Sequence, residues 1–237
     1  MNTTAPPLSA GADIPWSQLE TIMLDMDGTL LDLHYDSHFW LEHLPHRYAR
    51  HADLTPDEAQ ALILERIQRE KGTLNWYCID YWSDTLQMDV AAIKQEVSHK
   101  IRFRPLAQAF LRQLQRTHHR VVIVTNAHDA GLSIKRARLG LDSYVDHIYT
   151  SHEFGQPKEA QLFWQRLQDA EGFDPGRTLL IDDSQPVLHS AQRYGIAHLL
   201  GVLQPDSQEP PRTATELPAI HHFGELLPIH SRPRESV

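Results

Sequence analysis

The chain has 237 residues, of which 41% are hydrophobic and 22% are charged, and its formal net charge at pH 7 is −9. This length allows one large α/β domain with an insertion, or two smaller domains. The negative charge excludes a general electrostatic attraction to nucleic acid, so we expect no nucleic-acid polymer as a partner, whereas a small anionic substrate can still bind a local positive site.

Cysteine and histidine usage bears on the cellular compartment of the protein and on metal binding. Cys78 is the single cysteine, so no internal disulfide can form and a reducing compartment fits. The sixteen histidines show no metal-ligand spacing. The first residues lack the basic start and apolar run of a signal peptide, and no stretch is long and apolar enough to cross a bilayer. We expect a cytoplasmic protein without a membrane partner, of undetermined oligomeric state.

Five short apolar runs end in polar or turn residues, and each predicts a strand. Runs of this kind are typical of a parallel sheet that is buried on both faces. They are TIML before Asp25, RVVIV before Thr125, HIYTS near Ser151, RTLLI before Asp182 and AHLLGV near Val202. Helices are expected between them, at 105–117, 129–139, 158–170 and from Ser184 to Gly195. The alternation predicts a Rossmann-like, doubly wound α/β core.

One interval, from about residue 33 to 104, contains no predicted strand. Its clearest helix begins with Thr55 as N-cap, Pro56 at the first helical position and Glu58 completing a capping box, and it ends at Gly72. The flanking patterns predict further helices, so we expect a four-helix insertion. The expected organisation is a core of residues 1–33 and 104–225, a helical cap of residues 34–103, and a disordered tail of residues 226–237.

Polar side chains follow the predicted strands, where ligands gather in an open α/β sheet. Crowded carboxylates without histidine or cysteine favour Mg²⁺, and a lysine with a hydroxyl and an amide can hold an anion. Together they predict a phosphate site in which an aspartate could be the nucleophile. The residues concerned are Asp25, Asp27, Thr125, Asn126, Lys158, Asp182 and Asp183.

These groups resemble, in order, the four motifs of the haloacid dehalogenase superfamily phosphatases: DMDGT, the strand ending in Thr125, the G-x-x-K of residues 155–158, and IDDS. The helical insertion resembles the C1-type cap of that superfamily. A closer resemblance, carried by LDMDGTLLDL, TLNWYCIDYWSDTL, FGQPKE and RTLLIDDSQ, is to the bacterial GMP/IMP nucleotidase branch. That branch removes the 5′-phosphate from purine mononucleotides.

The resemblance implies roles for the first motif. Asp25 would attack phosphorus and form an aspartyl-phosphate, while Asp27 would protonate the leaving oxygen and then activate water. Gly28 would permit the turn that aims both carboxylates at one phosphate. Mg²⁺ would be bound by Asp25, the backbone carbonyl of Met26 and Asp182.

The remaining motifs have implied roles as well. Asp27 and Asp183 are further candidate metal ligands, the latter in contact with the ion or just behind its ligands. Thr125 and the amide of Asn126 would bind phosphoryl oxygens. Lys158 would neutralise charge on the nucleophile and on the transferring group.

An aromatic stretch of the insertion suggests where a nucleobase could bind. Trp76 and Tyr77 could stack on a purine, but the helical spacing of the stretch fits burial in the cap at least as well. Asp36, Phe39 and Trp40, just past the start of the insertion, are similar candidates for substrate binding.

The expected function is therefore Mg²⁺-dependent hydrolysis of a small-molecule substrate, a purine nucleoside 5′-monophosphate such as GMP or IMP. A phosphatase of the same mechanism that acts on a sugar phosphate or another small phosphate ester is the nearest alternative. A phosphomutase and a non-catalytic binding protein are more distant ones.

Overall fold

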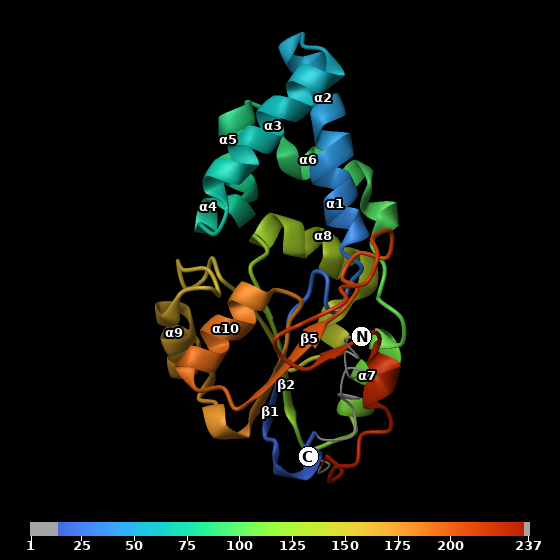
Figure 1. Ribbon diagram of the computed structural model, residues 1–237, viewed down its shortest axis with the longest axis vertical. Helices are drawn as coiled ribbons and strands as arrows, with labels where there is room; N and C mark the ends of the chain where they lie inside the picture. The colour runs from blue at the N-terminus through green and yellow to red at the C-terminus, as the bar shows by residue number, and fades with distance from the viewer. Residues whose placement is uncertain (1–13, 235–237) are drawn as a thin grey trace, which may run out of the picture.

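The computed structural model describes residues 14–234 and places a helical cap over one edge of a parallel sheet (Figure 1). The sheet has six strands in the order β3-β2-β1-β4-β5-β6, and every pairing is parallel. The strands are β1 (Thr21–Leu24), β2 (Arg120–Thr125), β3 (His147–Thr150), β4 (Thr178–Ile181), β5 (His198–Val202) and β6 (Ala219–Ile220). The predicted α/β class and five strands are confirmed, and β6 is too short to produce an apolar pattern.

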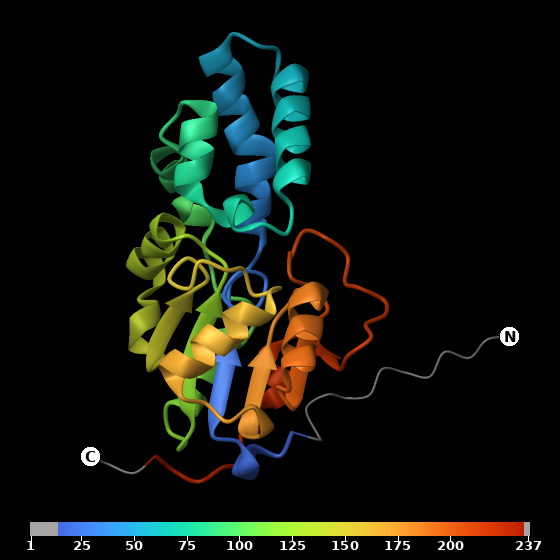
Figure 2. The same ribbon diagram turned by 90° about the vertical axis from the view of Figure 1, so that its left-hand side faces the viewer.

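Helices cover both faces of this sheet (Figure 2). Alternate residues of β1 point to opposite faces, so Ile22 packs into one apolar cluster and Met23 into the other. The first cluster includes side chains of α7 and α8, and the second is filled from α9 and α10. These helices are α7 (Ala107–Leu114), α8 (Asp129–Leu139), α9 (Gln161–Glu171) and α10 (Gln185–Tyr194).

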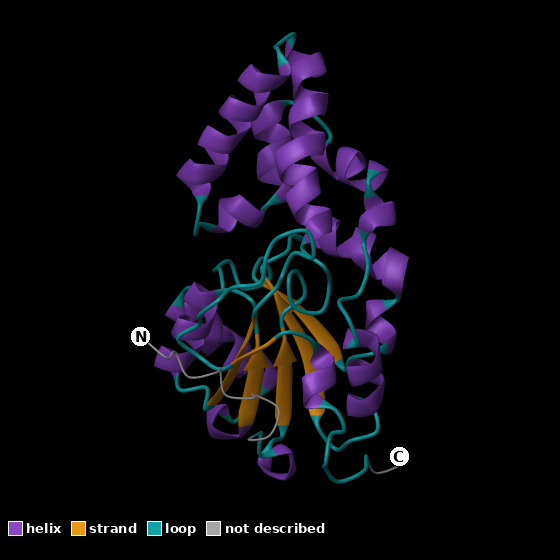
Figure 3. Ribbon diagram, turned by 45° about the vertical axis from the view of Figure 1, so that its right-hand side comes forward, coloured by secondary structure: helices purple, strands orange, loops and turns teal. Residues whose placement is uncertain are grey.

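The insertion between β1 and β2 is helical, as predicted, and lies above the ends of the strands (Figure 3). Its first three elements form one continuous rod, because the π-helical turn η2 joins α1 directly to α2. The elements of the cap are α1 (His34–His38), η2 (Phe39–His43), α2 (Leu44–Ala52), α3 (Pro56–Glu70), α4 (Leu74–Tyr77), α5 (Ile79–Leu86), α6 (Val90–Glu96) and η3 (Ser98–Lys100). The division into domains at residues 33/34 and 103/104 stays a proposal.

Local signals explain where these helices begin and break. The capping box before α3 is present, with Thr55 Oγ1 accepting from Glu58 N at 3.3 Å and Thr55 N donating to Glu58 Oε2 at 2.9 Å. Residues 73–87 form two helices and not one, because the extended backbone of Cys78 separates α4 from α5. Cys78 Sγ then caps α5 by accepting from Tyr81 N at 3.5 Å.

Two predicted helix starts differ from the structure. Helix α9 begins at Gln161, so Lys158 lies in the turn before it rather than in its first turn. Ser184 occupies the N-cap position of α10, but its side chain makes no capping hydrogen bond. Instead, Asp182 Oδ1 accepts from Ser184 N at 2.8 Å, so a carboxylate of the site supports the helix start.

The expected disorder of residues 226–237 is wrong for the described part, up to residue 234. His118 N donates to Arg232 O at 3.1 Å, and Arg234 N donates to Arg116 O at 2.9 Å. Ile229 is also buried against the core. These backbone hydrogen bonds and apolar contacts outweigh a polar composition that favours disorder. Residues 235–237 lie outside the described residues.

Short 3-10 helices connect the larger elements: η1 (Trp16–Gln18), η4 (Leu141–Ser143), η5 (Pro175–Arg177) and η6 (Phe223–Leu226). Within residues 14–234, none of the helices combines the length and apolar character that crossing a bilayer requires.

Candidate active site

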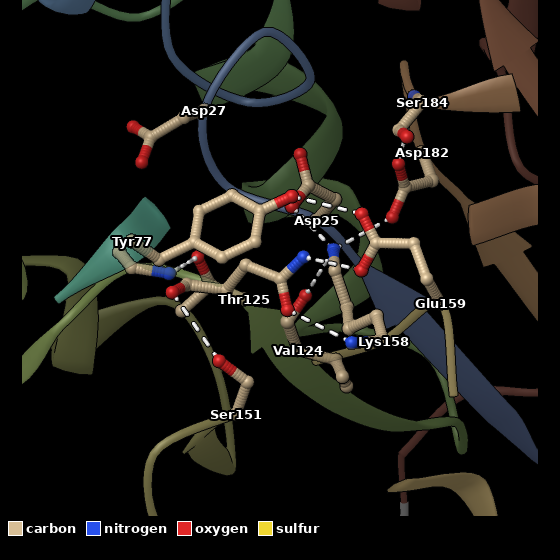
Figure 4. A network of polar contacts seen from close by, with 12 residues as sticks. Asp25, Asp27, Tyr77, Val124, Thr125, Ser151, Lys158, Glu159, Asp182 and Ser184 are labelled. Carbon is tan, nitrogen blue, oxygen red and sulfur yellow. Dashed lines mark hydrogen bonds and ion pairs between the residues drawn. The ribbon is translucent and has the colours of Figure 1, made fainter. Parts of the chain in front are cut away.

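Asp25 and Asp182 meet at the centre of the sheet because their strands are neighbours in register. Strand β1 pairs with β4 so that Leu24 lies opposite Ile181, and the next residue of each strand is an aspartate. Lys158 lies between the two carboxylates, with Nζ 2.6 Å from Asp25 Oδ1 and 2.7 Å from Asp182 Oδ2 (Figure 4). The fold therefore brings three predicted site residues together from three separate segments, and Lys158 is 133 positions from Asp25 and 24 from Asp182.

Burial strongly shifts the pKa values of ionisable groups in this centre. Burial lowers the pKa of Lys158, but Asp182 and Asp25 outweigh it and hold the pKa above its usual value, so the ammonium stays charged. Burial raises the pKa of Asp182 to about 7, although Lys158 opposes the shift. Burial, followed by repulsion from Asp25 and Asp182, raises the pKa of Asp183 well above its usual value. One lysine thus does not balance three buried acids.

The carboxylates fit a hard divalent cation. Ligand oxygens of Asp25, Asp182 and Asp183 lie within 4.8 Å of one another, and the buried Asp25 Oδ2 has no hydrogen-bond partner among residues 14–234. Buried charged oxygens that no donor satisfies are costly unless a cation approaches them. Gly28 completes the close packing, because a Cβ at that position would lie 2.8 Å from Asp183 Cγ.

The carbonyl of Met26 is partly engaged already. It accepts a hydrogen bond from Leu31 N at 2.8 Å in the turn that follows β1. A carbonyl oxygen has two lone pairs, so one stays open for a cation.

Thr125 is the last residue of β2 beside this centre, and the next residue, Asn126, organises the turn that carries Lys158. Asn126 Oδ1 accepts from Lys158 N at 2.9 Å, and Asn126 Nδ2 donates to Glu159 Oε2 at 3.1 Å. Thr125 Oγ1 accepts from Ala127 N at 3.0 Å. Ser151 N donates to Thr125 O at 2.9 Å. The Asn126 side chain thus positions the lysine, an arrangement that sequence reasoning missed.

Asp27 is directed away from Asp25 (Figure 4). Its Oδ2 lies 2.6 Å from Lys135 Nζ of α8, and its buried Oδ1 has no hydrogen-bond partner in the described part of the chain. The same ammonium lies 2.9 Å from Asp36 of α1, and Asp36 also contacts Lys94 Nζ of α6 at 2.5 Å. Two buried lysines therefore alternate with two carboxylates from the core into the cap.

This chain of ion pairs changes the proton affinity of its members. Burial raises the pKa of Asp27 to about 6 even though Lys135 opposes the shift. For Asp36, burial raises the pKa, but the attraction of Lys135 and Lys94 prevails and lowers it below its usual value. A carboxylate with a pKa near 6 can exchange a proton at neutral pH.

The cap aromatics predicted as substrate contacts fall into two places. Phe39 is fully buried and Trp40 is partly buried. Lys94 Nζ lies over both rings, 4.4 Å from the centroid of Phe39 and 5.6 Å from that of Trp40. Trp76 and Tyr77, in α4, have ring centroids 5.0 Å apart. Tyr77 reaches the core, where its hydroxyl donates to Glu159 Oε1 at 2.8 Å (Figure 4).

Several site residues could not be recognised from their sequence context. Lys135 and Lys94 sit in ordinary amphipathic helices, and Glu159 merely follows the motif lysine. Arg212 comes from the long segment between β5 and β6, where its Nη2 approaches Asp183 Oδ2 to 3.7 Å. Helical spacing places Asp36 and Lys135 on inward faces, but it does not say that they meet.

The fold and the acidic centre define a class of hydrolase. A family model described as haloacid dehalogenase-like hydrolase matches residues 22–200. This chain belongs to that family.

Two curated relatives share most of the chain. The GMP/IMP nucleotidase YrfG of Escherichia coli (strain K12) is 37% identical over 216 residues, which cover 91% of this chain and 97% of the relative. The protein of the same name from Shigella flexneri gives the same values.

Solved structures agree on the fold. A haloacid dehalogenase-type phosphatase from Thermococcus onnurineus has a TM-score of 0.74 at 19% identity, covering 88% of this chain and 96% of that one. L-2-haloacid dehalogenase from Xanthobacter autotrophicus has a TM-score of 0.56 at 16% identity, covering 80% of each chain. At these identities the likeness concerns the fold alone.

Proposed function

We propose that this haloacid dehalogenase-like hydrolase is a Mg²⁺-dependent phosphomonoesterase that acts on purine nucleoside 5′-monophosphates. The observation that carries the reaction type is the state of Asp25. One of its oxygens is held by Lys158, while Oδ2 is buried, receives no hydrogen bond from the described residues and lies close to two further acids. A carboxylate that Lys158 holds in one orientation can present one oxygen to a cation and the other to a phosphorus atom.

The proposed reaction has two displacements. One carboxylate oxygen of Asp25 bonds to phosphorus as the bond to the nucleoside 5′-oxygen breaks, while the other would face Mg²⁺, and Asp27 donates its proton to the nucleoside 5′-oxygen. In the second step Asp27 takes a proton from water as the water oxygen attacks phosphorus, which returns Asp25 as a carboxylate and releases phosphate. The pKa of Asp27, raised by burial to about 6, fits a group that donates and then accepts a proton.

The surrounding residues have supporting roles in this proposal. Asp25, Asp182 and Asp183 would hold Mg²⁺, with the Met26 carbonyl and Asp27 as further candidates, and the ion would supply positive charge for the phosphoryl oxygens. Lys158 neutralises charge beside the nucleophile. Thr125 and the Asn126 amide lie where a phosphoryl group would bind.

Substrate choice rests on a different set of observations. The two curated relatives named as GMP/IMP nucleotidases cover nearly the whole chain. In this protein, Trp76 and Tyr77 are paired on the side of the cap that touches Glu159. An aromatic pair above a phosphate site suits a planar base. We therefore place the purine between this part of the cap and the core.

A panel of phosphate monoesters tests the proposal. We expect phosphate release from GMP and IMP to exceed release from pyrimidine nucleotides and sugar phosphates, to stop when a chelator is added, and to be lost in Asp25→Asn. Asp142→Asn, which changes an exposed carboxylate paired with Arg136, is the matched control and should keep full activity. Metal-independent release would contradict the reaction, and a preference for sugar phosphates would contradict only the substrate.

The contribution of the cap is tested separately. Trp76→Ala should raise KM for GMP more than KM for a small phosphate ester that carries no base. Equal effects on both substrates would show that Trp76 does not contact the nucleobase.

A further inference from the structure

Cys78, His128 and His152 lie together at the boundary between cap and core, apart from the carboxylate centre. One ligand atom from each, a cysteine sulfur and two imidazole nitrogens, lies within 4.8 Å of the other two. Cys78 separates α4 from α5 in the cap, His128 precedes α8, and His152 follows β3. The three residues are distant along the chain, so only the fold assembles them.

The imidazoles are placed to bind a ligand between them. Their rings meet edge to face with centroids 4.8 Å apart. His152 Nε2 is buried, and none of the residues that the structure describes forms a hydrogen bond with it. Asp80 is the second residue of α5, and its Oδ2 lies 3.7 Å from His128 Nε2. A carboxylate oxygen therefore lies beside the cluster as well.

The donor set distinguishes this cluster from the carboxylate centre. A thiolate and two imidazoles prefer Zn²⁺ and similar transition metals, whereas Mg²⁺ prefers oxygen. In a tetrahedral zinc site, ligand atoms are about 3.3–3.6 Å apart, as follows from bond lengths of about 2.0–2.3 Å. Atoms that lie within 4.8 Å of one another need to close by at most about 1.5 Å, which side-chain rotation can supply at partly exposed positions.

We propose that Cys78, His128 and His152 form a second cation site, selective for Zn²⁺ or a similar transition metal, with Asp80 or water as the fourth ligand. The site ties the cap to the core, because Cys78 and Asp80 belong to the cap and both histidines to the core.

Binding has an identifiable local cost. His128 Nδ1 accepts from Ala130 N at the long distance of 3.4 Å and so helps to cap α8. A neutral imidazole bound to metal through Nε2 carries its proton on Nδ1 and cannot accept that hydrogen bond. Zinc binding therefore exchanges a weak cap for three metal–ligand bonds.

Zn²⁺ titration of the metal-free protein by calorimetry at pH 7 tests the proposal, with Co²⁺ absorption as a direct readout of a thiolate ligand. We expect one Zn²⁺ per chain and a near-ultraviolet thiolate-to-Co²⁺ band. Cys78→Ser should abolish the band, and both Cys78→Ser and His152→Gln should weaken Zn²⁺ binding at least about tenfold. Serine can still cap α5, so Cys78→Ser should keep the fold, which thermal unfolding checks.

Two further variants separate this site from other sources of binding. Asp182→Asn removes a ligand of the carboxylate centre and should leave Zn²⁺ binding intact. His189→Gln changes a histidine of α10 that pairs with Glu216 at 3.0 Å, and it should behave like the parent. The absence of Zn²⁺ binding in the parent, unchanged affinity in Cys78→Ser, or loss of binding in Asp182→Asn would each overturn the proposal.

Discussion

Lys135 joins a candidate acid–base residue of the core to the cap. Its ammonium lies 2.6 Å from Asp27 Oδ2 and 2.9 Å from Asp36 Oδ2, and its side chain is 2% exposed. Burial lowers the pKa of Lys135, but the two carboxylates raise it above its usual value, so the ammonium is charged. The position of the Asp27 carboxylate therefore depends on a residue that also contacts cap helix α1.

Lys135→Met should lower kcat and move the pH profile. Removing the buried ammonium removes the attraction that lowers the pKa of Asp27, so the midpoint that reports this group should move above about 6. We expect kcat to fall by about 10-fold to 100-fold, within the range of general acid–base contributions. The measurement is kcat against pH with a saturating nucleotide.

The control for this prediction is Lys71→Met, which replaces an exposed lysine at the end of α3. It should change neither kcat nor the midpoint. Lys135→Arg keeps the positive charge, so its kcat and its midpoint should lie closer to those of the parent than the values of Lys135→Met do. A lower kcat in Lys135→Met with an unmoved midpoint would indicate a structural role only.

Asp182→Asn should stabilise the protein in chelator, increasingly so as the pH rises. The pKa of Asp182 is raised from 3.8 to about 7 by burial, so the folded state binds this proton more tightly than the unfolded state. The stability from this group is fully present below pH 3.8 and is lost as the pH rises through about 7. Asparagine cannot lose a proton, and the difference should reach a few kcal/mol at most.

Denaturant unfolding of both proteins between pH 4 and pH 8 measures this difference. Added Mg²⁺ should reverse its sign at neutral pH, because only the parent keeps all the carboxylates that bind the ion. A stability difference that does not change with pH would show that Asp182 titrates normally.

Gly28→Ala should weaken Mg²⁺ binding, whereas Gly172→Ala should not. Both glycines have positive φ, +86° and +73°, so alanine strains either backbone by about 1–2 kcal/mol. Only at Gly28 would the new Cβ meet another group, at 2.8 Å from Asp183 Cγ, whereas nothing lies within 4 Å at Gly172. Calorimetric Mg²⁺ titration of the two folded variants separates the effects. Similar losses of affinity would mean that the contact with Asp183 is unimportant.

The parts of the fold that sequence patterns predicted are those with a local cause. The runs before Asp25, Thr125 and Asp182 are strands because continuous apolar residues require burial on both faces. The capping box at Thr55 marks the start of α3 for an equally local reason. Strand β6 and the packed tail have no such pattern, since pairing with Gly201 and with the segment before β2 holds them in place.

In the candidate site, too, some contacts could be predicted from the sequence and others could not. Asp25, Lys158 and Asp182 could be predicted to meet because parallel strands present their ends at one edge of a sheet. The contacts of Lys135, Glu159 and the Cys78 cluster depend on how the cap sits on the core. Histidine spacing along the sequence, which indicated no metal site, says nothing about imidazoles that the fold brings together from different segments.

Tyr77→Phe should raise KM for nucleotides because it removes a hydrogen bond between cap and core. Tyr77 OH donates to Glu159 Oε1 at 2.8 Å, and burial together with Glu159 keeps the pKa of Tyr77 far above its usual value, so the phenol retains its proton. A hydrogen bond to a charged group contributes about 1.5–3 kcal/mol, so we expect nucleotide affinity to fall at least about tenfold when it is removed.

Tyr81→Phe is the matched control for that variant. Tyr81 OH donates to Glu70 Oε1 over the same 2.8 Å, but both residues belong to the cap. Steady-state kinetics with GMP should therefore show a raised KM in Tyr77→Phe and parent-like values in Tyr81→Phe. Equal KM values in the two variants would mean that the hydrogen bond between Tyr77 and Glu159 does not help to hold the cap over the substrate.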